Sequence, residues 1–108
     1  MKRIASVAVL AAFIALPALA SAQDVEKGKA LYTANKCQQC HAIEGKGTKK
    51  YPLDGVGGKL SGDDITKWIT APAEMEAKLA EKPKIHMKAY KLADADLKSL
   101  VAYMQSLK

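Results

Sequence analysis

The chain has 108 residues, of which 17 are basic and 11 acidic, so its formal net charge is +6 at pH 7. After Lys2 and Arg3 every basic residue is a lysine, and the lysines lack interleaved aromatics, which excludes a typical nucleic-acid-binding surface. A disulfide between the two cysteines, Cys37 and Cys40, would close too short a loop to stabilise the fold much.

The N-terminal segment predicts a secretory signal peptide. Lys2 and Arg3 precede an almost wholly apolar run over residues 4–20, and Ala20-Ser21-Ala22 offers a small-x-small cleavage site. The alternative is a retained membrane anchor, but the run is short for a membrane span and contains Pro17 near its end.

Cleavage of residues 1–22 would leave one domain, residues 23–108, without stable membrane insertion. The mature chain would have 108 less 22, or 86, residues, enough for one small domain and too few for two. We therefore expect an exported protein of the periplasm.

Residues 25–36 predict the first helix of the mature chain, with Asp24 as its N-cap. This helix leads directly into Cys37-Gln38-Gln39-Cys40-His41, the attachment signature of a c-type haem. Two thiols separated by two residues fall on one side of a helical turn, so both can form thioether bonds to one edge of a haem. His41 then faces the iron and supplies the proximal ligand as a neutral imidazole.

Two other uses of a Cys-x-x-Cys pair fit less well. A thioredoxin-like dithiol normally follows a strand in a βαβ unit, and no such pattern occurs here. A structural zinc site needs about four ligands, and His86 is the one further ligand of the usual nitrogen or sulfur kind. The sequence therefore predicts one haem c, covalently held by Cys37 and Cys40.

The middle of the chain predicts a loop and then short helices. Residues 43–59 hold five glycines and one proline, so we expect a loop and no strand there. Residues 61–70 predict a helix with Ser61 as its N-cap and apolar side chains spaced for one face. Pro72 ends this helix or starts the next turn. Residues 73–81 predict a further helix with a weak apolar face.

The last segment has the clearest helical pattern of the chain. Asp94 is its expected N-cap, and apolar residues recur at steps of three and four: Leu97, Leu100, Val101, Met104 and Leu107. No segment shows sustained alternation of apolar and polar residues, so we expect an all-α protein.

From its first helix to its C-terminus, the mature chain resembles a small monohaem class I cytochrome c of bacteria. The resemblance implies three to five helices wrapped around one covalent haem, with the N- and C-terminal helices crossing. Gly28 and Tyr32 match the crossing point on the first helix, and Leu100 and Tyr103 are their expected partners. The small Gly28 would let the two backbones approach closely.

The resemblance also implies roles for three residues outside the haem motif. The segment around Pro52 resembles the loop on the proximal side of the haem, where the Pro52 carbonyl would accept a hydrogen bond from His41. Trp68 matches a tryptophan whose N–H meets a haem propionate. Met87 lies a short loop before the last helix, where the family places its distal methionine ligand.

Three methionines remain after signal removal, and Met87 suits the distal position best. Met104 lies in the apolar stripe of the last helix, and Met75 lies between acidic residues on a predicted helix. The chain departs from the family pattern at Lys88, where a proline often follows the methionine. His86 is either a rival ligand, which would lower the reduction potential, or an exposed loop histidine.

Lysines cluster in the glycine-rich loop and around the proposed distal loop, as Lys46, Lys49, Lys50 and Lys59, then Lys82, Lys84, Lys88 and Lys91. If these loops frame the haem edge, a positive ring would attract redox partner proteins with acidic docking surfaces. The alternative is a solvated surface that keeps the protein soluble.

The resemblance implies a soluble periplasmic electron-transfer protein, which we expect to be a monomer and not an enzyme. His41 and Met87 would hold the iron on its two faces. Two alternatives remain open. One is a haem-based sensor or small haem enzyme with an open distal site, and the other is an electron-accepting subunit of a periplasmic oxidoreductase.

Overall fold

The computed structural model describes residues 15–108, and most of them are helical, as predicted. Helix α1 spans Ala15–Ala34. Asp24 therefore lies inside this helix, and its predicted role as N-cap is wrong because the helix begins upstream of it. The chain leaves the helix where Lys36 adopts a left-handed conformation with φ 58°. Most of the predicted signal segment, residues 1–14, lies outside the described residues.

A small sheet follows the haem motif, where the sequence predicted a loop without strands. It contains β1 (His41–Ile43), β2 (Lys46–Gly47) and β3 (Tyr51–Pro52) in the order β2-β1-β3. β1 pairs antiparallel with β2 and parallel with β3. Gly47 makes the close approach possible, because a Cβ there would overlap the His41 carbonyl oxygen and φ is 108°. Strands of two or three residues are too short to show alternation, which is why the sequence did not predict them.

Helix α2 spans Val56–Lys59 and α3 spans Gly62–Thr70. The predicted start of α3 is confirmed, since the Ser61 hydroxyl accepts a hydrogen bond from the Asp64 backbone N–H at 3.1 Å. Its apolar face is confirmed too, with Ile65 and Ile69 buried.

Helix α4, Pro72–Glu76, is shorter than the predicted segment 73–81 and begins with its proline at the first helical position. The Lys82 ammonium donates to the carbonyl oxygens of Ala77 and Leu79, at 2.9 and 2.8 Å, and so binds carbonyls that no longer have helical partners. The good helix formers after Glu76 do not continue the helix.

Helix α5 spans Asp94–Gln105, so it begins one residue earlier than the predicted cap at Asp94 implies. Ala93 is the N-cap and makes no side-chain hydrogen bond there, so Asp94 is the first helical residue. The predicted apolar stripe is confirmed, because Leu100, Val101 and Met104 are all buried.

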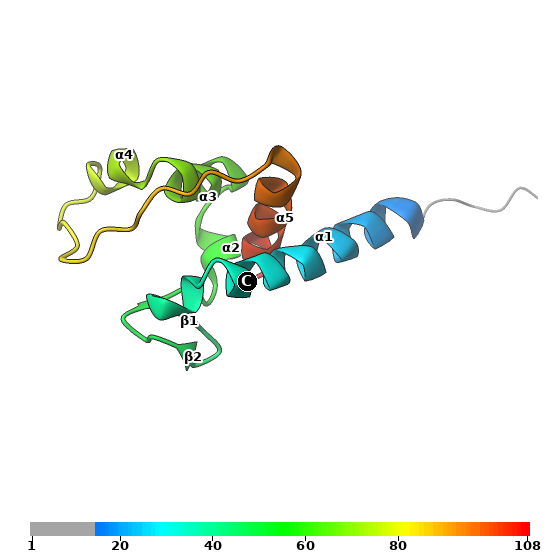
Figure 1. The fold of residues 1–108 in the computed structure, drawn as a ribbon, viewed down its shortest axis with the longest axis horizontal. Coiled ribbons are helices and arrows are strands. Elements are labelled where there is room, and N and C mark those ends of the chain that lie inside the picture. Colours follow the sequence, from blue (N-terminus) through cyan, green and yellow to red (C-terminus); the bar gives the residue numbers. More distant parts are fainter. Residues whose placement is uncertain (1–14) are drawn as a thin grey trace, which may run out of the picture.

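The N- and C-terminal helices, α1 and α5, cross at Gly28 (Figure 1). A Cβ on Gly28 would overlap the Ser99 carbonyl oxygen and lie 2.7 Å from the Cβ of Tyr103, so the small residue permits the approach. One turn further on, the rings of Tyr32 and Tyr103 meet edge to face with centroids 5.9 Å apart. The core at this crossing continues into α3 through Ile65 and Ile69.

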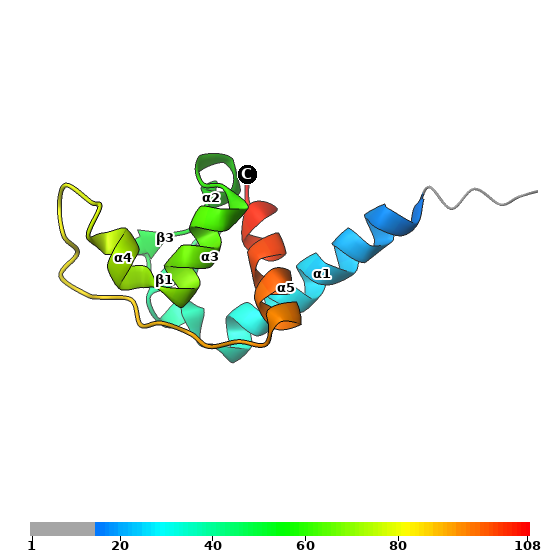
Figure 2. The ribbon, with the colours of Figure 1, turned by 90° about the horizontal axis from the view of Figure 1, so that it is seen from above.

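Figure 2 shows α4, β1 and β3 at the end of the molecule away from the start of α1. The segment that joins α4 to α5, residues 77–93, has no helix or strand and runs from this end back to α5. The haem motif and the proposed distal loop therefore share one end of the fold.

Candidate functional site

The two cysteines of the motif lie on one tight turn. A 3-10 helix spans Cys37–Gln39, and the Cys40 backbone N–H donates to the Cys37 carbonyl oxygen at 3.1 Å. Both thiols are free, with Cys37 half-buried and Cys40 exposed. Burial raises the pKa of the Cys37 thiol, whereas redox dithiols depend on a thiol pKa that is lowered. The turn therefore suits thioether attachment better than dithiol chemistry.

His41 follows on β1 with its ring oriented by the backbone. Its Nδ1 lies 2.8 Å from the carbonyl oxygen of Tyr51. A carbonyl oxygen only accepts, so Nδ1 carries the proton and donates, and Nε2 keeps its lone pair for a metal. The expected acceptor was the Pro52 carbonyl. The structure places Tyr51 there instead, because the parallel register pairs His41 with Tyr51 and Ala42 with Pro52.

A cavity of about 530 Å³ adjoins the motif, within the range of small-molecule and cofactor sites, about 300–1,000 Å³. It is lined by five of the six site residues that the sequence predicted, namely Cys37, Cys40, His41, Trp68 and Met87. Pro52 is exposed, and its neighbours Tyr51 and Leu53 line the cavity instead. Apolar side chains from α2, its C-cap, α3 and α5 form further walls: Val56, Leu60, Ile65, Ile69, Leu100 and Met104.

The methionines differ in their relation to this cavity. Met87 is half-buried, lies in the loop between α4 and α5, and lines the cavity. Met104 also lines it but is a core residue of α5 with 6% of its surface exposed. Met75, 8% exposed, does not belong to the cavity's lining among the described residues. Met87 is thus the methionine that reaches the cavity from a separate segment of chain.

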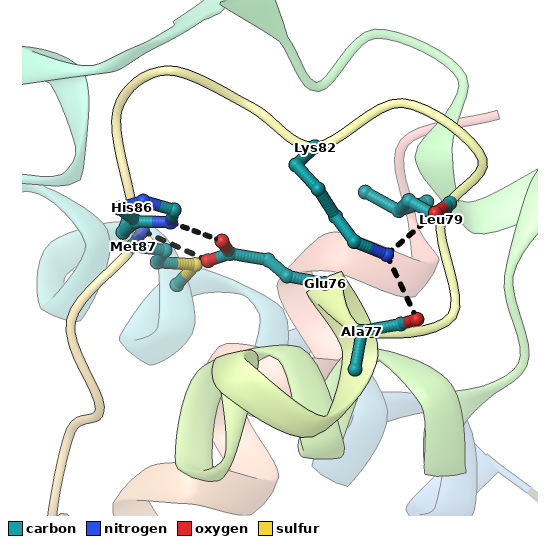
Figure 3. Close-up of polar contacts among 6 residues, drawn as sticks. All are labelled: Glu76, Ala77, Leu79, Lys82, His86 and Met87. Atoms are coloured by element: carbon teal, nitrogen blue, oxygen red, sulfur yellow. Dashed lines mark hydrogen bonds and ion pairs between the residues drawn. The ribbon is translucent and has the colours of Figure 1, made fainter.

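The structure adds one residue that the sequence did not single out, the buried carboxylate of Glu76. Glu76 is 7% exposed, lines the cavity and faces the distal loop (Figure 3). Its Oε1 lies 2.5 Å from Nδ1 of His86, and its Oε2 accepts a hydrogen bond from the Met87 backbone N–H at 3.3 Å. An acidic residue on a short helix with a weak apolar face gave no sequence signal for this position.

The surface near the cavity carries exposed lysines and two exposed apolar side chains. All eight lysines of the two predicted clusters are exposed, and Lys88 lines the cavity. The Lys88 ammonium lies 5.0 Å from the centroid of the Tyr90 ring, in cation–π contact. Leu79 and Ile85, 39% and 48% exposed, also line the cavity.

These residues fit a covalently attached haem. Two free thiols on one turn, an imidazole with one nitrogen available and a mostly apolar cavity are the donor set and environment that a c-type haem requires. The hydroxyl of Tyr32, at the cavity wall, is buried and has no hydrogen-bond partner among the described residues. In residues 15–108, no cluster of three or more His, Cys, Asp or Glu side chains offers a competing metal site.

None of the helices in residues 15–108 has the length and apolar character needed to cross a membrane. No curated protein and no solved structure matches the chain. The family model described as Cytochrome c matches residues 25–108, which include the haem motif, the cavity lining, α5 and the part of α1 that crosses it. The chain therefore belongs to the cytochrome c family, and membership implies a covalently bound c-type haem attached through its cysteines, Cys37 and Cys40.

Proposed function

We propose that this member of the cytochrome c family is a periplasmic carrier of single electrons with His41 and Met87 as its axial ligands. One observation carries the ligand set: the cavity beside the cysteines is lined both by His41 on β1 and by Met87 on the loop before α5. These are separate segments of chain, which supports a site with one nitrogen and one sulfur ligand.

The haem, when bound, supplies the one-electron chemistry of its iron. The chain's own residues hold the site in one geometry. The Tyr51 carbonyl fixes the tautomer and orientation of His41, which raises the basicity of Nε2. Apolar walls from α2, α3 and α5 exclude water. A carrier that keeps both ligands in its oxidised and reduced forms reorganises little, which favours transfer over catalysis.

The proposed partners are redox proteins with acidic docking surfaces. Exposed lysines in both loops, Lys88 at the cavity among them, support this proposal because a positive surface attracts an acidic partner and raises the rate of encounter. A diffusing carrier of this kind works as a monomer.

The salt dependence of electron transfer tests the proposed docking charge. We expect the second-order rate constant with an acidic redox protein to fall about tenfold or more as ionic strength rises from millimolar levels to about 0.5 M, because salt screens the attraction. The control partner is a small neutral oxidant, whose rate should change little. Equal salt dependence for both partners would contradict the proposal.

The periplasmic location rests on residues 1–22, which carry the charge pattern and cleavage site of a signal peptide. Cleavage after Ala22 would remove the first residues of α1. The mass of the purified protein tests this, since the mature chain with its haem should begin at Gln23.

The visible spectrum of the ferrous protein, before and after addition of carbon monoxide, tests the proposed function. Sharp bands that do not move would support a closed, six-coordinate iron and an electron carrier. A prompt shift would contradict the ligand set and favour a sensor or enzyme with an open distal site. Recovery of the protein only with a larger partner would favour an electron-accepting subunit.

A further inference from the structure

The loop that carries Met87 has few restraints of its own. Its end is anchored where the Tyr90 backbone N–H donates to the Ile69 carbonyl oxygen at 2.9 Å. Before that point, residues 83–89 make only two hydrogen bonds with the rest of the described chain, and both go to Glu76. Lys88 follows Met87, so the loop also lacks the fixed φ that a proline would impose there.

Glu76 is well placed to act as the missing restraint. It is the last residue of α4, a helix whose first residue, Pro72, is also buried, so the carboxylate stands on a packed element. A buried carboxylate is costly unless its oxygens are paired. Here one carboxylate oxygen accepts a hydrogen bond from the ring N–H of His86, and the other accepts one from the backbone N–H of Met87 (Figure 3).

The two hydrogen bonds of Glu76 hold His86 and Met87 by different groups. His86 also lines the cavity, but its side chain is held at a ring nitrogen and is 71% exposed. Met87 is held by its backbone, which leaves its thioether free, and the residue is half-buried at the cavity. The same carboxylate thus fastens one candidate ligand by its ring and the other by its main chain.

We propose that Glu76 is a positioning residue that selects the distal ligand, holding the loop so that Met87 and not His86 reaches the iron. This inference rests on the proposed function, because it requires Met87 to be the ligand. Without the carboxylate, the loop would lose its two central hydrogen bonds and the imidazole of His86 would be released beside the same site.

The test compares holoprotein variants at two glutamates of α4. Glu76→Ala removes both hydrogen bonds, and Glu74→Ala is the matched control because Glu74 is exposed on the same helix. Two readouts report on the iron: the weak absorption band of the ferric protein that arises from methionine sulfur on iron, and carbon monoxide affinity of the ferrous protein.

We expect Glu76→Ala to weaken the methionine band and to raise carbon monoxide affinity about tenfold. A change of this size corresponds to the free energy that a hydrogen bond to a charged group contributes. Glu74→Ala should behave as the wild type. Glu76→Gln keeps an oxygen that can accept the Met87 N–H, so its effect should be intermediate, and it serves as the test if the alanine variant does not fold. Identical spectra and affinities for the Glu76 variants and Glu74→Ala would overturn the proposal.

A second substitution tests the part played by His86. In the Glu76→Ala background, His86→Ala should raise carbon monoxide affinity further, because no released imidazole remains to compete for the open position. Equal affinity in the single and double variants would overturn the claim that Glu76 restrains His86.

The wild-type spectrum separates this proposal from the proposed function. A wild type with the methionine band that Glu76→Ala leaves intact would overturn only the role of Glu76. A wild type with a two-imidazole spectrum that His86→Ala abolishes would overturn both, and Glu76 would then be the carboxylate that orients His86 as a ligand.

Discussion

At the scale of single residues, the site depends on which ligand atoms of His41 and Met87 are free of hydrogen bonds. The Tyr51 carbonyl accepts a hydrogen bond from Nδ1 of His41, so Nε2 remains available to a metal. Glu76 accepts a hydrogen bond from the backbone N–H of Met87, so the Met87 sulfur remains available too. Residue identities in the motif were readable from the sequence because covalent haem attachment demands their spacing. The hydrogen-bond partner of His41 could not be read from the sequence, because a shift of one residue in strand register decides whether the carbonyl of Tyr51 or that of Pro52 faces its ring.

Replacing Met87 or Met75, the two methionines of residues 15–108 that lie outside α5, tests the distal ligand directly. Met87→Ala should lower the reduction potential and open the sixth position to carbon monoxide, because the thioether that stabilises ferrous iron is lost. Met75→Ala, at a residue that lies outside the cavity lining, should change neither property. The measurements are redox titration and carbon monoxide binding. An iron opened by Met75→Ala would show that the ligand is misassigned.

Tyr32 should make stability depend on alkaline pH. Burial, with smaller contributions from neighbouring groups, raises its pKa from 10.0 to about 12. The unfolded chain ionises this phenol at lower pH than the folded protein does. Its contribution to the free energy of unfolding is therefore fully present below pH 10 and is lost as pH rises towards 12.

Tyr32→Phe is the variant that isolates this effect. Between pH 10 and 12, its denaturation midpoint should fall less steeply than that of the wild type, while at pH 7 the loss of an unpartnered hydroxyl should cost little. Urea titrations across the pH range measure both. Parallel curves for the two proteins would contradict the assigned role of Tyr32.

At the scale of elements, helices were predicted where strong local signals coincide. The Ser61 cap and the stripe of α5 both appear as predicted, because capping and burial depend on residues close in sequence. The bounds of α4 did not follow from its residues, because the chain turns after Glu76 and the Lys82 ammonium binds the carbonyls of Ala77 and Leu79. Side-chain contacts of this kind leave no periodic pattern in the sequence.

The crossing of α1 and α5 depends on Gly28. Gly28→Ala should destabilise the fold by about 1–3 kcal/mol, because the added Cβ overlaps the Ser99 carbonyl oxygen and forces the helices apart. Gly28→Val should cost more. Neither change should alter the haem ligands, so thermal melting should shift while the visible spectrum stays the same.

Gly58→Ala is the matched control for this prediction. A Cβ on Gly58 meets nothing within 4 Å, and the residue lies in α2 without positive φ. Alanine there should be neutral or stabilise the protein by up to about 1 kcal/mol, since it favours the helix. Equal melting temperatures for the Gly28 and Gly58 variants would argue against a tight crossing.

At the scale of the whole molecule, the cavity adjoins the core that α1, α3 and α5 share. Side chains from α1, α2, α3, α5 and the distal loop line the cavity, so a group bound there would pack against all of these elements. If residues 1–22 are cleaved as proposed, the remaining 86 residues, 108 less 22, have little apolar surface to spare. We therefore expect the haem to be a structural component as well as the redox centre.

The haem-free chain should therefore be largely unfolded. Replacing both Cys37 and Cys40 by serine prevents covalent attachment, and the resulting protein should lose most helical signal in circular dichroism and show no cooperative melt. The haem-bearing wild type is the control. A native-like, cooperative transition in the double variant would show that the polypeptide folds on its own.

The meeting of Gly28 with Ser99 and Tyr103 also sets an order of events during biogenesis. The loop that this contact closes contains the haem motif, the cavity walls and the distal loop, so nearly the whole chain must emerge before the contact can form. Until then Cys37, Cys40 and His41 have no packed helix pair behind them. Haem attached before this contact forms would meet an open chain, and closure of the terminal helices would then complete the protein.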